Sequence, residues 1–237
     1  MRSHLASLAA IGLLAAACAT AAPAATLAPS ETVTATPLAT PSPSPSPTPD
    51  PPRPTGRDIV EQDWAPFATT AGITLHHPSR RVELIGFHES THEGAQQLTV
   101  TATVSPWVAM ETRDRGSPSR SAADIVVDPA TEIRSPVTGT VKRAGSYTLY
   151  CDHTDHFLVI TPDGRDDLEV KMLHFEGLAV GVSDRVEAGV TVVGSGARLL
   201  PFESQVDEHT AQPSWPHVHV ELVDTDIPNI PGDGPAC

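Results

Sequence analysis

The C-terminal two thirds of the chain contain short segments in which apolar residues alternate with polar ones, separated by Gly and Pro turns. Such alternation is typical of β-strands that bury one face. The sequence shows neither the 3.6-residue period of a long amphipathic helix nor a repeat of fixed length. The expected strands lie at residues 82–89, 98–104, 138–145, 147–151, 156–160, 168–174, 185–194 and 217–223.

This pattern predicts a mainly β domain, organised as a sandwich, a barrel or a rolled sheet. Asp163-Gly164, between two of the strands, is a strong signal for a tight hairpin. Residues 57–118 hold only a few strands, too few for a core of their own. We therefore expect them to extend the sheet of the following residues.

The strand at residues 217–223 carries two histidines separated by one valine. Side chains at positions i and i+2 of a strand point to the same side, so His217, His219 and Glu221 share one face. The valines and the leucine between them share the other face, which belongs in a core. Two solvated histidines on an exposed face would explain this strand as well as a functional site would.

The chain has 237 residues and a formal net charge of -14. An acidic surface repels the phosphates of nucleic acid and the head groups of anionic lipid. We therefore expect no nucleic-acid partner and no electrostatic docking on a membrane.

The N-terminal segments indicate export. Residues 1–18 combine Arg2 with an apolar stretch too short to span a bilayer, as in a signal peptide. They end in "LAAAC", which resembles a bacterial lipobox, so Cys18 is the expected lipidation site; the alternative is a plain cleaved signal. Residues 19–56 are rich in Pro, Ser and Thr and predict a disordered tether. We expect an extracytoplasmic protein, either lipid-anchored to the cell membrane or secreted.

Two cysteines remain if Cys18 carries lipid. Cys151 and Cys237 would then lie in an oxidising compartment, where a disulfide could tie the tail at residues 225–237 to the body of the domain. Two free thiols are the alternative.

Three segments, read together, resemble a known family. They are "DIVVDPATEIRSPVTGTVKRAG" at residues 124–145, "KMLHFEGLAVGVSDRVEAGVTVVGSG" at residues 171–196 and "HVHVEL" at residues 217–222. Their order along the chain and their residue patterns resemble those of the lysostaphin/LytM-type zinc endopeptidase domain, which cuts peptide cross-bridges in bacterial cell walls. The resemblance delimits a domain at residues 119–224. It implies an antiparallel sheet or rolled β-sandwich with a groove and few or no helices in its core.

The resemblance also implies roles for individual residues. The family holds zinc with two histidines and one aspartate and leaves a fourth position for water. By position, Asp124 and His219 match two of these metal ligands. His174 and His217 match the two catalytic histidines that contact the water and the developing oxyanion.

The sequence departs from the family at the first zinc ligand. The family has a histidine four residues before the aspartate, and this chain has Arg120 there. Arginine stays protonated and offers no lone pair, so it cannot bind zinc. We expect Arg120 to form a salt bridge with Asp124 in the place of the metal.

An incomplete ligand set favours a catalytically degenerate domain without a cofactor. Such a pseudoenzyme would bind peptidoglycan stem or cross-bridge peptides, or regulate a cell-wall hydrolase. The alternative is an active zinc endopeptidase with an atypical ligand set. In that case the missing ligand would come from elsewhere, and His88, near the end of an expected strand, is the main candidate. His209 is another.

Two further clusters have simple explanations. "HESTHE", with His88 and His92, would need a helix to bind metal through both histidines, and a polar loop is the favoured interpretation. Arg113 and Arg115 fit a solvated loop, although they could also form an anion-recognising edge of the groove that grips a peptide carboxylate.

Overall fold

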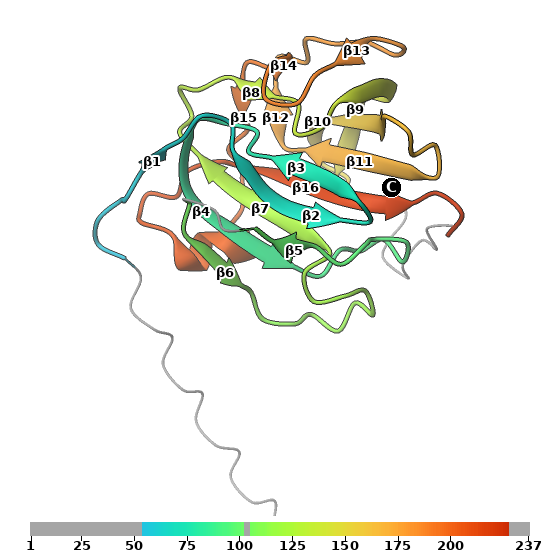
Figure 1. The fold of residues 1–237 in the computed structure, drawn as a ribbon. Helices are drawn as coiled ribbons and strands as arrows, with labels where there is room; N and C mark the ends of the chain where they lie inside the picture. The colour runs from blue at the N-terminus through green and yellow to red at the C-terminus, as the bar shows by residue number, and fades with distance from the viewer. Residues whose placement is uncertain (1–53, 102–104, 228–237) are drawn as a thin grey trace, which may run out of the picture. The chain divides into compact units, whose positions relative to one another are not determined.

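The computed structural model describes residues 54–101 and 105–227, and almost all of their regular structure is β-strand (Figure 1). The prediction of a mainly β, antiparallel domain is confirmed. The predicted signal at residues 1–18, with Cys18, lies outside the described residues. So do nearly all of the tether and Cys237.

One large sheet dominates the domain. Its strands follow the order β1, β4, β7, β16, β11, β10, β9, β13, with β6 beside β4. All neighbours are antiparallel except β4 and β6. The bounds are β1 (Val60–Glu61), β4 (Arg81–His88), β6 (Trp107–Ala109), β7 (Ala122–Val127), β9 (Gly139–Leu149), β10 (His153–Pro162), β11 (Leu168–Leu173), β13 (Arg185–Val186) and β16 (His217–Asp224).

Smaller sheets complete the domain. One contains β2 (Pro66–Thr70), β3 (Ile73–His76) and β5 (Thr99–Val100), and two pairs join β8 (Ile133–Arg134) to β14 (Val192–Gly194) and β12 (Phe175–Glu176) to β15 (Gly196–Ala197). Among the described residues the helical content is one 3₁₀ turn, η1 (Gln205–His209). No described helix is long and apolar enough to cross a membrane.

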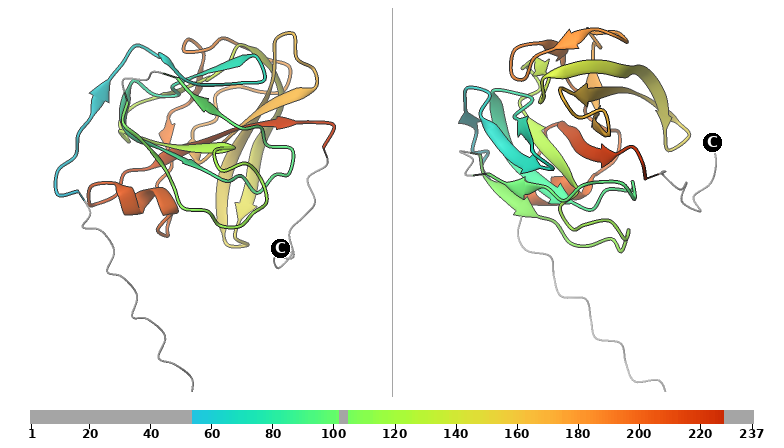
Figure 2. Two further views of the ribbon diagram at one scale, coloured as in Figure 1. Left: turned by 60° about the horizontal axis from the view of Figure 1, so that its bottom comes forward. Right: turned by 45° about the vertical axis from the view of Figure 1, so that its right-hand side comes forward.

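The structure contains strands that the alternation did not predict, among them β2, β3 and β7, and it divides two of the expected regions differently. The segments expected at 138–145 and 147–151 form one continuous strand, β9, which pairs along its length with β10. Figure 2 shows this long hairpin curving, so that the sheet is rolled. The segment expected at 185–194 is instead broken into β13 and β14, because Gly189 lies between them with a φ of 68°.

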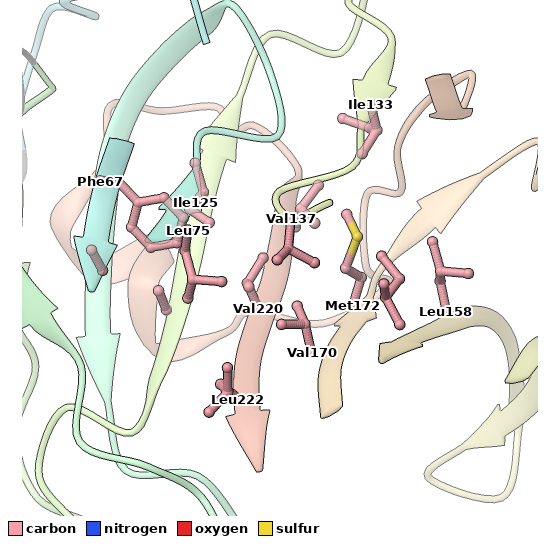
Figure 3. Packing of buried hydrophobic residues seen from close by; sticks show 14 of the residues in the cluster. Phe67, Leu75, Ile125, Ile133, Val137, Leu158, Val170, Met172, Val220 and Leu222 are labelled. Carbon is pink, nitrogen blue, oxygen red and sulfur yellow. The ribbon is translucent and has the colours of Figure 1, made fainter. Parts of the chain in front are cut away.

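The apolar faces of the strands form one core. On β16 the side chains of Val218, Val220 and Leu222 are fully buried, as the alternation predicts. In Figure 3 Phe67 and Leu75, from β2 and β3, lie against Ile125 of β7. The small three-stranded sheet therefore covers the part of the apolar face that β7 contributes.

Residues 57–118 and 119–224 share this large sheet. β4, from the first range, pairs with β7, from the second, over most of the length of both strands. The N-terminal strands thus lie directly beside the strand that carries Asp124.

Steric crowding explains why position 139, in the "SPVTGTV" turn, is a glycine. A Cβ atom on Gly139 would collide with the main-chain oxygen of Thr161, which belongs to the strand paired with β9. Any larger residue would push these two strands apart at the start of the hairpin.

Candidate metal centre

Three neighbouring strands bring the candidate ligands together. β16 pairs with β7 so that His219 lies directly opposite Asp124. On the other side of β7, Gly86 of β4 is opposite Asp124, and His88 lies two residues further along the same face of β4. Strand register alone therefore places His88, Asp124 and His219 on one patch of the sheet.

The donor atoms of these three residues lie close together. His219 Nδ1 is 2.8 Å from Asp124 Oδ1, and His88 Nε2 is 3.2 Å from the same oxygen. One ligand atom from each of the three residues lies within 4.8 Å of the other two, and all three residues are buried. Two imidazole nitrogens and a carboxylate oxygen are a typical ligand set for zinc that leaves a fourth position open.

The orientation of His88 also fits a metal ligand. Its Nδ1 donates a hydrogen bond to the main-chain oxygen of Glu89 over 2.9 Å, which fixes the tautomer and turns Nε2 toward Asp124. That Nε2 is buried, and its contact with Asp124 Oδ1 lacks the geometry of a hydrogen bond. With the ring proton on Nδ1, a neutral His88 turns the lone pair of Nε2 toward a carboxylate oxygen, an arrangement that a bound cation would complete.

Glu221 supports His219 from behind. Its Oε2 lies 3.5 Å from His219 Nε2, and its Oε1 accepts a hydrogen bond from Lys171 Nζ over 2.9 Å. Ser90 Oγ donates a further hydrogen bond to the same carboxylate. A carboxylate behind a histidine is the usual arrangement that orients a ligating imidazole.

His174 and His217 face each other beside this group. Their ring centroids are 5.2 Å apart, and His217 Nε2 lies 3.9 Å from Asp124 Oδ2. His174 follows β11 and has a φ of 66°, in the left-handed region that residues other than glycine rarely adopt. Such a conformation persists only where the surroundings enforce it.

Asp155 holds the ring of His174. The His174 Nδ1 donates to Asp155 Oδ2 over 2.6 Å, and Tyr147 donates its hydroxyl to the same oxygen over 2.8 Å. Asp155 is fully buried on β10, and its Oδ1 accepts the main-chain N–H of His156. Burial would raise the pKa of Asp155, but these hydrogen bonds outweigh it and lower the pKa. Asp155 is therefore ionised and fixes the orientation of the His174 ring through its Nδ1 proton.

The two histidines of β16 have opposite electrostatic environments. Burial lowers the pKa of His217 to about 4 against the opposing charge of Asp124, so its imidazole is neutral near pH 7. Burial also disfavours the charge on His219, but Asp124 and Glu221 outweigh it and raise its pKa to about 9. For Asp124, burial is outweighed by the neighbouring histidines, above all His88, which hold its pKa well below the usual value.

These side chains line a cavity of about 570 Å³. Its wall includes the five residues His88, Asp124, His174, His217 and His219, together with other polar, charged and apolar side chains. The wall also includes Arg113, Arg115, Tyr147, Tyr150, Lys171, Phe202 and Glu221.

The structure brings together four residues that the resemblance implied, which are Asp124, His174, His217 and His219. The interpretation of His217 and His219 as solvated is wrong, because their exposed fractions are 4% and 9%. His88, expected only as a substitute ligand, lies in the same group.

Arg120 does not occupy the place expected for it. Within residues 54–101 and 105–227 it forms no ion pair with Asp124, whose carboxylate faces three histidines. Its main-chain oxygen accepts a hydrogen bond from Leu98, and its Nε is buried without a hydrogen-bond partner. The expected salt bridge was wrong because His88, from the neighbouring strand, fills the space beside Asp124.

The remaining histidine candidates lie outside the ligand group. His92 accepts a hydrogen bond from the main chain of Gly94 through Nδ1, as expected for a polar loop. His209 ends the 3₁₀ turn η1. Neither belongs to the set of donor atoms around Asp124.

Cys151 lies in the turn between β9 and β10 and is disulfide-bonded. The partner predicted for it, Cys237, lies outside the described residues, so the pairing remains a prediction. The preceding residue, Tyr150, is largely exposed at the cavity wall.

Comparisons with known proteins give little further support. No protein-family profile matches the sequence, and no curated protein sequence matches it. Among solved structures the chain is similar to one described as a novel M23 metalloprotease, pseudoalterin, from the deep sea. The TM-score is 0.35 and the identity 15%, over 72% of this chain and 72% of that chain. A likeness this weak carries no argument about function, which must come from the site.

Proposed function

We propose that this protein is a metal-dependent endopeptidase of lysostaphin/LytM type that cleaves peptides of the bacterial cell wall. In this proposal His88 replaces the ligand missing at Arg120. One observation carries it: the donor atoms of His88, Asp124 and His219 lie within 4.8 Å of one another, beside His174 and His217. The missing ligand was the main reason to expect a degenerate site, and the position of His88 removes that reason.

His88 Nε2, Asp124 Oδ1 and His219 Nδ1 would hold the metal. Zinc suits this mixture of nitrogen and oxygen donors, and when bound it lowers the pKa of a water molecule and polarises a carbonyl group. The buried Nε2 of His88, which faces Asp124 Oδ1 without a hydrogen bond, is the observation that best fits such an ion.

His217 and His174 would handle protons and developing charge. His217 is neutral near pH 7, so it can accept a proton from the attacking water. The Nδ1 N–H of His174 donates a hydrogen bond to Asp155, so Nε2 is the ring nitrogen that can face the substrate. A His174 ring protonated at both nitrogens would donate a hydrogen bond from Nε2 to the oxyanion that forms from the scissile carbonyl.

The cell-envelope setting is part of the proposal and rests on the sequence. A lipid on Cys18, or secretion after signal cleavage, would place the domain outside the cytoplasm. The Pro-rich tether at residues 19–56 would let it reach away from the membrane. Its substrates would be peptidoglycan stem or cross-bridge peptides.

A second function is favoured by one feature of the same site. His219 lies between two carboxylates, with Nδ1 toward Asp124 and Nε2 toward Glu221, so a protonated ring would present one N–H to each of them. The raised pKa of His219 fits this ion-paired arrangement, which needs no metal. A pseudoenzyme that binds cell-wall peptides or a cell-wall hydrolase would use the same cavity without hydrolysis.

Metal analysis and hydrolysis of cell-wall peptides distinguish the two functions. The purified exported form should contain about one equivalent of zinc and should cut purified peptidoglycan, releasing new amino groups. Chelation should abolish the activity, and added zinc should restore it. Protein that binds no zinc and releases no amino groups, while still binding peptidoglycan in a pull-down, would establish the binder instead.

A further inference from the structure

The loop at residues 111–116 brings two arginines to the wall of the metal cavity. Arg113 and Arg115 both line this cavity, together with His88 and Asp124. Arg113 is exposed and Arg115 is half-buried. Burial and the neighbouring charge of Arg113 lower the pKa of Arg115, against the opposing effects of Tyr150 and Asp124.

Glu89, the residue after the candidate ligand His88, fixes this loop. Its carboxylate accepts hydrogen bonds from Thr112 Oγ1 over 2.6 Å and from the main-chain N–H groups of Arg113 and Arg115 over 2.9 and 3.2 Å. Arg115 Nη1 donates in return to the main-chain oxygen of Glu89 over 2.7 Å. The two arginines therefore have a defined position relative to the candidate metal ligands.

Both guanidinium groups are short of partners. Among the described residues, Arg113 makes no side-chain hydrogen bond or ion pair, and Arg115 makes only the bond to Glu89. Six other arginines each pair with a carboxylate, namely Arg57, Arg81, Arg134, Arg143, Arg165 and Arg185. Arg113 and Arg115 differ from these six because their guanidinium groups have no carboxylate partner within the described part of the chain and both line the cavity that holds the candidate metal ligands.

We propose that Arg113 and Arg115 bind a carboxylate of the substrate peptide beside the bond that is cut. This inference rests on the proposed function and names a substrate class for it, namely peptides that carry a free carboxylate within reach of the scissile bond. A guanidinium presents two parallel N–H donors that match the two oxygens of a carboxylate. The half-buried position of Arg115 strengthens such a contact, because water competes less for it.

The carboxylate could be the C-terminus of the peptide or an acidic side chain, and four probes distinguish these sources. Two are N-acetylated penta-alanine peptides that end in a free carboxylate or in a carboxamide. The other two end in a carboxamide and hold glutamate or glutamine at the central position. Binding is measured by isothermal titration calorimetry of the protein with a chelator present, so that no probe is hydrolysed.

We expect one or both acidic probes to bind at least about tenfold more tightly than their neutral partners. In Arg113→Gln and Arg115→Gln that preference should fall to about twofold or less. Arg115→Lys keeps the charge but loses the paired donors, so it should keep part of the preference. Arg185→Gln is the matched control, because Arg185 pairs with Asp163 away from the cavity, and it should bind as the wild type does.

The outcomes separate this inference from the proposed function. Equal binding of acidic and neutral probes, binding of none of them, or an unchanged preference in both glutamine variants would overturn the carboxylate site. Any of these results could be found together with zinc-dependent cleavage of peptidoglycan. In that case the proposed endopeptidase function would still hold. A preference that depends on the arginines in a protein without hydrolytic activity would support the carboxylate site and reject the endopeptidase. Thermal unfolding of each variant shows whether a loss of binding reflects a loss of fold.

Discussion

His88, at the end of β4, and Asp124, in β7, lie beside each other with Nε2 of the histidine 3.2 Å from Oδ1 of the aspartate. The antiparallel register of the two strands creates this neighbour relationship, although a long segment of chain separates the residues. Four positions before the aspartate, where the LytM-type family has a ligand histidine, this chain has Arg120. The ligand that a local motif lacks is thus supplied from the adjacent strand.

The first prediction concerns the affinity for zinc. His88→Ala should weaken zinc binding by about a hundredfold or more, because a site left with two protein ligands holds zinc poorly. Competition with a chromogenic chelator measures the change in Kd. Arg120→Gln is the control and should bind zinc as the wild type does, since Arg120 does not contact Asp124. Equal affinity in His88→Ala and wild type would remove His88 from the ligand set.

Glu221→Gln should reduce the affinity for zinc without removing a ligand. The Glu221 carboxylate lies behind His219 and also accepts hydrogen bonds from Lys171 and Ser90. A neutral amide orients the imidazole less firmly and lowers its basicity, and changes of this kind typically cost about tenfold to a hundredfold in metal affinity. Zinc binding and urea unfolding are measured together. A wild-type Kd in a folded Glu221→Gln protein would show that Glu221 does not support the site.

Much of the site was predictable from strand periodicity. The alternation in β16 placed His217, His219 and Glu221 on one face, and the structure keeps that face around a cavity. Asp124 and His174 were candidates only through the resemblance to the LytM-type family. The shared face of His217, His219 and Glu221 was predictable because a period of two fixes which side of a sheet a residue occupies, whatever the tertiary contacts are.

The rest of the site depends on contacts between strands that are distant in sequence. Asp155, in "CDHTDHFLVI", has no motif around it, and it reaches His174 only because β10 pairs with β11. His88 was a candidate, but only the pairing of β4 with β7 selects it over His209. Arg120 was assigned to the site from spacing alone, and sequence spacing cannot show that another side chain already fills the space.

Stability should depend on pH through His77, which lies outside the metal centre. The His77 ring is fully buried, with Nδ1 2.6 Å from the Ala65 oxygen and Nε2 2.9 Å from the Ser105 hydroxyl. Burial lowers its pKa below 6.5 in spite of the Ala65 hydrogen bond. The unfolded chain therefore takes up this proton more readily than the folded one. Its contribution to stability is complete above the ordinary histidine pKa of 6.5 and is lost as the pH falls toward the lowered value.

His77→Gln tests this pH dependence. The variant should lose less stability than the wild type between about pH 7.5 and about pH 5, because it has no buried imidazole to protonate. Urea unfolding at both pH values gives the two differences. Phe67→Leu is the matched control, since Phe67 packs edge-on against His77 and its truncation should cost about 1 kcal/mol or more at either pH. A wild-type pH dependence in His77→Gln would exclude His77 as its source.

The last prediction separates the positioning of His174 from the binding of metal. Asp155→Asn keeps the shape of the side chain but removes the charged acceptor that holds the Nδ1 proton and the orientation of His174. We expect kcat to fall by between about tenfold and a thousandfold, while KM and zinc content stay near the wild-type values. Tyr147→Phe removes only one hydrogen bond to the same carboxylate and should lower kcat by less than about tenfold. If Asp155→Asn instead lost its zinc with kcat per bound metal unchanged, Asp155 would support the metal ligands rather than His174. If it kept full activity, the hydrogen bond between Asp155 and His174 would have no part in turnover.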